Sequence, residues 1–180
     1  MSRRFLVAFL VCTLAACDRQ SEPVAVRDNA SHGLAHSVNS AEVNQWLAGL
    51  RAALAPFHRF DAATAAGYNA QITPCMEQAG AGGMGFHYGD TRLIDAKVEE
   101  FAPELLLYEP QKNGQLRLVA VEYIVPFSAW TQPEPPSLHG LVFHKNNTFQ
   151  VWALHAWVWQ HNPAGMFTDW NPRISCAATS

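Results

Sequence analysis

An apolar and aromatic run extends from Phe149 to Trp159 with the sequence FQVWALHAWVW, and a single histidine, His155, interrupts it. An apolar run of this length without polar alternation is typical of a strand that is buried on both faces. A titratable side chain inside such a strand is costly unless it finds a partner. The pattern therefore predicts a central strand with one titratable group that needs an explanation.

The N-terminal part of the chain has a helical pattern. Ser40 is the predicted N-cap. The apolar positions that follow recur every three or four residues and form one stripe of an amphipathic helix: Val43, Trp46, Leu47, Leu50, Leu54 and Phe57. A short second helix is predicted from Asp61 to Ala66, ending at Gly67, and a third from Thr91 to Phe101.

The C-terminal half predicts four strands. Glu104–Glu109 and Gln115–Val125 flank Asn113-Gly114, which is a strong hairpin signal. Leu138–Lys145 would form a second hairpin with the Phe149–Trp159 run. We therefore expect an α+β fold in which N-terminal helices pack on a curved antiparallel sheet of about four strands.

The length of the loop in the second hairpin sets the register of its two strands, and the register determines which histidine side chains lie close together. A two-residue turn at Asn146-Asn147 would place His144 opposite Phe149 and Leu138 opposite His155. In that register His139 and His155 point to opposite faces, and His144 is about 17 Å from His155 along the strand. A cluster of these three histidines is not expected.

Two other residues are better partners for His155. Glu122 shares a face with Leu116, Leu118, Ala120 and Ile124, so the carboxylate lies in an apolar row and needs a partner. The glycine-rich block before Tyr88 is expected to form a loop that presents His87. The block formally matches G-x-G-x-x-G, but no buried strand precedes it and no helix follows, so a dinucleotide site is not expected.

His87, Glu122 and His155 together have the composition of a mononuclear metal site. Two imidazoles and a carboxylate bind zinc or non-haem iron with open positions, and copper is a further candidate. His139 would be an additional ligand if a bulge changed the register. The alternatives are a metal-free module that binds a small apolar ligand or a protein partner, an acid/base enzyme using Glu122 and His155, and a purely structural role in the core.

The N-terminus predicts export. Arg3 and Arg4 precede an apolar segment, and the sequence Leu-Ala-Ala-Cys follows, ending at Cys17. This order resembles a lipoprotein signal peptide, in which Cys17 becomes the lipidated first residue. We expect residues 1–16 to be removed, residues 17–39 to form a flexible tether, and residues 40–180 to form one α+β domain. The protein would then be anchored in a bacterial cell envelope and face the periplasm.

The cysteines agree with an oxidising compartment. If residues 1–16 are removed and Cys17 carries lipid, Cys75 and Cys176 remain, and we predict a disulfide between them. The chain has 12 basic and 15 acidic residues, and the predicted cleavage removes two of the basic ones. No basic patch for nucleic acid is present.

Five sequence blocks resemble an uncharacterised group of secreted bacterial proteins: GGMGFHY, LLLYEP, LVAVEY, LHAWVWQHNPAGMF and NPRISC. The resemblance extends from about Phe60 to Cys176. It places His87, Glu122 and His155 within these blocks and implies no particular activity.

Overall fold

The computed structural model describes residues 39–177. The predicted signal peptide, the lipidation site Cys17 and the predicted tether up to residue 38 lie outside the described residues. No helix within residues 39–177 is long and apolar enough to cross a membrane.

The described chain begins with three short helical elements. The helix α1 spans Ser40–Leu54, the 3₁₀ helix η1 spans Ala55–His58, and α2 spans Phe60–Ala66. The N-cap of α1 is Asn39 and not the predicted Ser40, because the Asn39 side chain accepts hydrogen bonds from the backbone N–H groups of Ala41 and Glu42. As predicted, α2 ends at Gly67, which has a positive φ of 125°.

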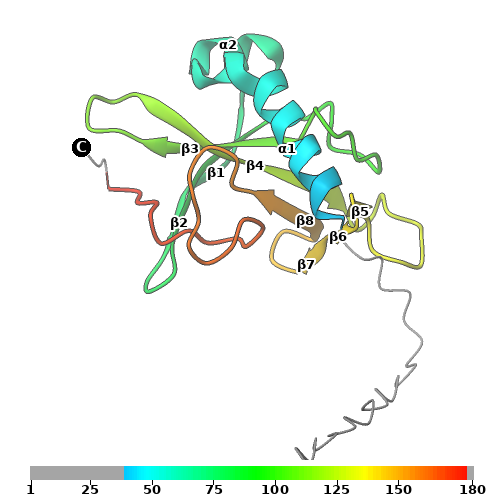
Figure 1. Ribbon diagram of the computed structural model, residues 1–180. Coiled ribbons are helices and arrows are strands. Elements are labelled where there is room, and N and C mark those ends of the chain that lie inside the picture. Colours follow the sequence, from blue (N-terminus) through cyan, green and yellow to red (C-terminus); the bar gives the residue numbers. More distant parts are fainter. Residues whose placement is uncertain (1–38, 178–180) are drawn as a thin grey trace, which may run out of the picture. The chain divides into compact units, whose positions relative to one another are not determined.

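A curled antiparallel sheet of six strands lies beside these helices (Figure 1). Its order is β1-β2-β3-β4-β8-β7. The bounds are β1 Ala70–Gln78, β2 Gly82–Gly89, β3 Leu105–Pro110, β4 Leu116–Pro126, β7 His144–Asn146 and β8 Val151–Ala156. A separate pair of two-residue strands, β5 Ser137–Leu138 and β6 Leu141–Val142, completes the described elements.

The prediction of about four strands was wrong, since the main sheet has six. The strands β1 and β2 were missed. In β1, Pro74 interrupts the pattern and most side chains are at least partly exposed, as a strand at the edge of a sheet permits. The glycine-rich segment expected to be a loop is β2, where Gly82 and Gly85 have positive φ values. The predicted strand Leu138–Lys145 is broken into pieces of β5, β6 and β7.

The predicted helix Thr91–Phe101 is also absent, and the segment consists of turns and bends. Aspartate side chains bond to nearby backbone groups here. Asp90 accepts from the Arg92 N–H, and Asp95 accepts from the Lys97 N–H. Such local bonds compete with a helix for backbone donors.

Two apolar cores lie on the two faces of the sheet. On one face, α1 buries Trp46, Leu47 and Leu50 against strand residues that include Tyr123 and Leu154. The opposite face carries a smaller core in which Leu105, Ala120, Ile124 and Trp157 pack together. This second face contains the candidate site.

A bulge in β4 decides which side chains reach the second face. Tyr108 of β3 pairs with Leu118, but the preceding Leu107 pairs with Ala120, so Val119 is the extra residue. Leu118 therefore belongs to the core under α1, and the predicted common face of Leu118 with Ala120 and Glu122 was wrong. Glu122 itself does lie in an apolar row.

The Cys75–Cys176 disulfide is present, as predicted, with a Cα–Cα distance of 5.7 Å. It connects β1 to the segment that follows β8, across a sequence separation of 101 residues. This segment is further attached to β2 by a bridge between Gly83 and Asn171. Within the segment, the Trp157 indole donates to the Thr168 carbonyl. The C-terminal segment is therefore part of the folded domain and covers the second face.

Candidate metal centre

Three neighbouring parts of the sheet bring the predicted ligands together. His87 lies on β2, Glu122 on β4 and His155 on β8. Glu122 and His155 are direct cross-strand partners. The strand β3 lies between β2 and β4, where Leu107 pairs with His87 and Leu105 with Glu122. The three polar side chains consequently lie on one face, with apolar neighbours between them.

The three ligand groups are close and almost completely buried. His87 Nε2 lies 3.4 Å from Glu122 Oε2, and His155 Nδ1 lies 3.8 Å from Glu122 Oε1. One ligand atom from each residue lies within 4.8 Å of the others. The exposed fractions are 3% for His87, 6% for Glu122 and 2% for His155. Ligands about 2.0–2.2 Å from one zinc ion lie a little over 3 Å apart, so a modest contraction would suffice.

A further residue orients His87. Thr73 of β1 places its Oγ1 2.7 Å from His87 Nδ1, in a buried contact. If Nδ1 carries the proton and donates to the hydroxyl, Nε2 keeps its lone pair and faces Glu122. Such a partner on the other ring nitrogen fixes the orientation and tautomer of a metal-binding histidine.

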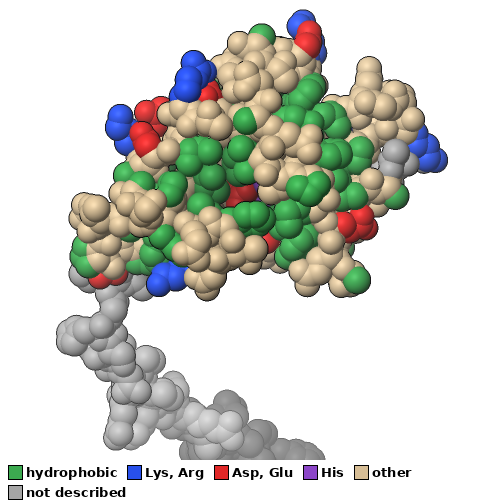
Figure 2. Space-filling view, turned by 180° about the vertical axis from the view of Figure 1, so that it is seen from behind, with side chains coloured by type: hydrophobic (Ala, Val, Ile, Leu, Met, Phe, Trp, Pro, Cys, Tyr) green, Lys and Arg blue, Asp and Glu red, His purple; other side chains and the backbone are tan. Residues whose placement is uncertain are grey.

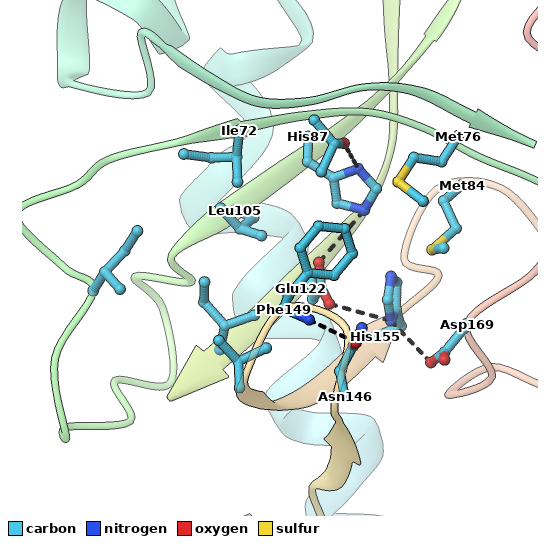
Figure 3. Close-up of a pocket in the computed structure, with 14 residues that line it drawn as sticks. Ile72, Met76, Met84, His87, Leu105, Glu122, Asn146, Phe149, His155 and Asp169 are labelled. Atoms are coloured by element: carbon cyan, nitrogen blue, oxygen red, sulfur yellow. Dashed lines mark hydrogen bonds and ion pairs between the residues drawn. The ribbon is translucent and has the colours of Figure 1, made fainter. Parts of the chain in front are cut away.

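Asp169 of the C-terminal segment lies beside His155, at the same ring nitrogen that faces Glu122. Its Oδ1 lies 3.2 Å from His155 Nδ1, and its Oδ2 lies 3.2 Å from His144 Nε2. The contact to His155 has the distance but not the alignment of a hydrogen bond, and both ring nitrogens of His155 lack a hydrogen-bond partner. Figure 3 shows Asp169 at the edge of the pocket, with His155 between it and Glu122.

The electrostatics favour a neutral His87 beside a cationic His155. Burial, together with the nearby His155, lowers the pKa of His87 to about 3. Burial alone would also lower the pKa of His155, but the carboxylates of Glu122 and Asp169 outweigh burial and raise it. Burial raises the pKa of Glu122, with opposition from His155. A bound cation would replace the proton that this group of residues otherwise needs.

The site forms the bottom of a cavity of about 240 Å³. Its walls are mostly apolar: Ile72, Met76, Met84, Ile94, Leu105, Ile124, Phe149 and Val151. Figure 2 shows the hollow from the side opposite to Figure 1, with hydrophobic side chains around it and acidic and histidine atoms inside. In Figure 3 the side chains of His87, Glu122 and His155 point toward one another.

His139, the predicted additional ligand, lies elsewhere. Its Nδ1 is 2.9 Å from Glu42 Oε1, and its ring packs 5.3 Å from the indole of Trp46. Both of these neighbours belong to α1, on the other face of the sheet. The physical reason is that His139 occupies a turn between β5 and β6 with a φ of 50°, and not a continuous strand.

The predicted register of the second hairpin was wrong by several residues. His144 pairs with Ala153 and Asn146 with Val151, so the loop contains four residues and not two. Asn146 closes the loop because its side chain accepts from the N–H groups of Thr148 and Phe149. This shift brings His144 near the site, where it reaches Asp169.

Sequence reasoning found His87, Glu122 and His155 but missed Thr73 and Asp169. The only sequence signal for Asp169 is its position in an aromatic, turn-rich segment that ends at a disulfide cysteine, and Thr73 has no signal because β1 was not recognised. Comparisons with family models, with curated proteins and with solved structures found no match. The functional argument therefore depends on the geometry of the site.

Proposed function

We propose that this protein is a bacterial cell-envelope lipoprotein that binds one divalent metal ion through His87, Glu122 and His155. The observation that carries the proposal is the meeting of three buried ligand groups within 4.8 Å at the bottom of a cavity. They come from three different strands and are separated by more than thirty residues in sequence.

A metal explains these groups better than a purely structural role does. A buried charge is stable only when hydrogen bonds or an opposite charge compensate it. Glu122 has no hydrogen-bond donor of good geometry and lies within ion-pair distance of the two imidazoles only. His155 lies 3.2 Å from Asp169 but makes no aligned hydrogen bond. A cation between the three would satisfy the carboxylate and both rings together. When bound, such an ion supplies Lewis acidity and open positions for a ligand or substrate.

The donor set allows zinc, iron or copper. Two imidazoles and one carboxylate fit zinc and non-haem iron. Copper is the third candidate metal, because imidazole ligands also bind divalent copper. A metal-free acid/base enzyme is the second candidate, supported by the direct cross-strand pairing of Glu122 with His155. A metal-free module for a small apolar ligand or a protein partner is favoured by the apolar cavity walls.

Metal analysis tests the proposal. Protein purified without a histidine tag should contain close to one equivalent of zinc, iron or copper, or take it up after treatment with chelator. The His155→Ala and Glu122→Gln variants should lose the ion. His139→Ala is the matched control, since His139 is also a largely buried histidine beside carboxylates. The absence of stoichiometric metal in the parent protein, with no change in His155→Ala, would refute a metal site.

The envelope location is a proposal from the sequence, supported by the disulfide, since such bonds persist mainly in oxidising compartments. Mass spectrometry of the N-terminal peptide tests it. The peptide should begin at Cys17 and carry lipid, and the protein should fractionate with membranes. In a Cys17→Ser variant the protein should appear in the soluble periplasmic fraction. An unmodified chain that begins at Met1 would contradict the proposal.

A further inference from the structure

We propose that the cavity above the three ligand residues binds a small organic anion with an apolar body and one carboxylate head, and that this head completes the coordination of the metal. The inference rests on the proposed metal site and adds a ligand class to it. It follows from the walls, the mouth, the bottom and the size of the cavity.

The walls and the mouth indicate an apolar body. Only five large hydrophobic side chains are exposed in the described residues, and two of them, Ile72 and Phe149, line this cavity. They are 39% and 48% exposed, and they come from β1 and from the loop before β8. Exposed apolar side chains gathered around one opening are typical of a binding site. An apolar ligand would remove them from water.

The bottom of the cavity indicates an anionic head. His87, Glu122 and His155 supply three donor groups, and catalytic zinc sites with three protein ligands keep a further position open. One glutamate ligand leaves a divalent ion with a net positive charge, and the second carboxylate of the cavity, Asp169, is paired with His144. The cavity opens onto this position, since the same three residues line it. An oxygen ligand that carries a negative charge would complete both the coordination and the charge balance.

The volume limits the size of the ligand. The cavity measures about 240 Å³. For comparison, an apolar cavity of about 150 Å³ accommodates benzene. The space therefore fits one aromatic ring with a short substituent, or a chain of similar volume. Benzoate and hexanoate are probes of this class.

Titration calorimetry of the full-length protein tests the inference in its metal-loaded and its chelated forms. Benzoate or hexanoate should bind the metal-loaded protein at least tenfold more tightly than acetate, which lacks the apolar body. Both should also bind at least tenfold more tightly than benzyl alcohol or hexanol, which lack the carboxylate charge. Removal of the metal should lower the affinity for benzoate and hexanoate at least tenfold and should change the affinity for the alcohols little.

A matched pair of variants tests the position of the ligand. Phe149→Ala should weaken the binding of benzoate several-fold. Phe101→Ala should leave the affinity for benzoate unchanged, because Phe101 is exposed to a similar extent but does not line the cavity. If the ion binds but acetate binds as tightly as the larger acids, or none of these acids binds, the inference is overturned while the metal site stands. If no ion binds, the proposed function fails first and this inference with it.

Discussion

Glu122 occupies a strand position that usually holds an apolar side chain. Its neighbours across the sheet are Leu105 and His155, and its own strand supplies Ala120 and Ile124 on the same face. A carboxylate there stabilises nothing by packing, and burial raises its pKa. The cost of burying this carboxylate has to be offset by what its oxygens bind, so Glu122 is the residue on which the metal proposal depends most.

Asp169 should influence metal affinity without binding the metal itself. An Asp169→Asn change keeps the size of the side chain but removes the negative charge beside His155 Nδ1. Loss of this negative charge next to the site should weaken the binding of a cation there. A competition titration with a chelating dye measures the affinity. Asp61→Asn, at an exposed position in α2, is the control. An unchanged affinity in Asp169→Asn would show that the 3.2 Å contact has no role in the site.

Glu104 should make the stability of the domain depend on pH. The side chain is 2% exposed, its Oε2 accepts from the Ile124 N–H, and burial raises its pKa to about 8. The folded protein therefore keeps a proton that the unfolded chain releases near its ordinary pKa of about 4.3. The contribution of Glu104 to the free energy of unfolding is therefore fully present below that pKa, and it is lost as the pH rises toward 8.

The Glu104→Gln variant isolates this effect. Glutamine can still accept from the Ile124 N–H and has no charge to bury. Urea unfolding between pH 5 and pH 8.5 should show the parent losing stability on the order of a few kcal/mol from this group, and the variant losing less. Glu99→Gln, at an exposed position, should behave like the parent. If the free energy of unfolding changed with pH in the same way in the parent and in Glu104→Gln, the raised pKa would not be the cause of the pH dependence.

The success of the sequence analysis differed between elements for physical reasons. The amphipathic stripe of α1 and the Asn113-Gly114 hairpin of β3 and β4 are encoded locally, so both were predicted correctly. The strand β1 is at the edge of the sheet and mostly not buried, so it has no clear alternation to detect. The helix predicted for Thr91–Phe101 from its start and stop signals does not form, and side-chain bonds from Asp90 and Asp95 replace it.

The same reasoning explains the result for the site. Glu122 and His155 could be identified because each interrupts an apolar strand, which is a local signal. Their direct pairing depends on the register of β4 with β8, which a long connection separates in sequence. His139 was proposed as a ligand on the assumption of one continuous strand, and a turn replaces it.

The backbone of β2 requires glycine close to His87. Gly85 has a φ of 86°, and a Cβ at this position would clash with the Tyr108 carbonyl of the neighbouring strand. Gly85→Ala should therefore lower the free energy of unfolding by more than backbone strain alone, which costs about 1–3 kcal/mol. Gly80→Ala is the matched control, because Gly80 has a φ of 81° and no atom lies within 4 Å of the place where an alanine methyl group would stand. Equal losses of stability in the two variants, measured by urea unfolding, would exclude the clash.

At the scale of the whole molecule, one covalent bond holds the C-terminal segment and β1 together. In the chain-entropy description, a disulfide that closes a loop of this length stabilises by about 4 to 5 kcal/mol, with smaller values common. A Cys75→Ala/Cys176→Ala double variant should unfold at clearly lower urea concentration. The reducing agent dithiothreitol should lower the midpoint of the parent and leave the double variant unchanged. A parent midpoint that is insensitive to reduction would contradict a stabilising role.

The cross-strand pairing of Glu122 with His155 makes the geometry of the polar groups at the bottom of the cavity independent of the apolar residues at its mouth. These two residues are fixed by the centre of the sheet, whereas Ile72 and Phe149 at the mouth belong to an edge strand and a loop. If the cavity binds a ligand as proposed, substitutions at the mouth should alter which molecules bind, with little effect on the geometry at the bottom. Variants of the mouth would then differ in selectivity while the sheet holds Glu122 and His155 in the same positions.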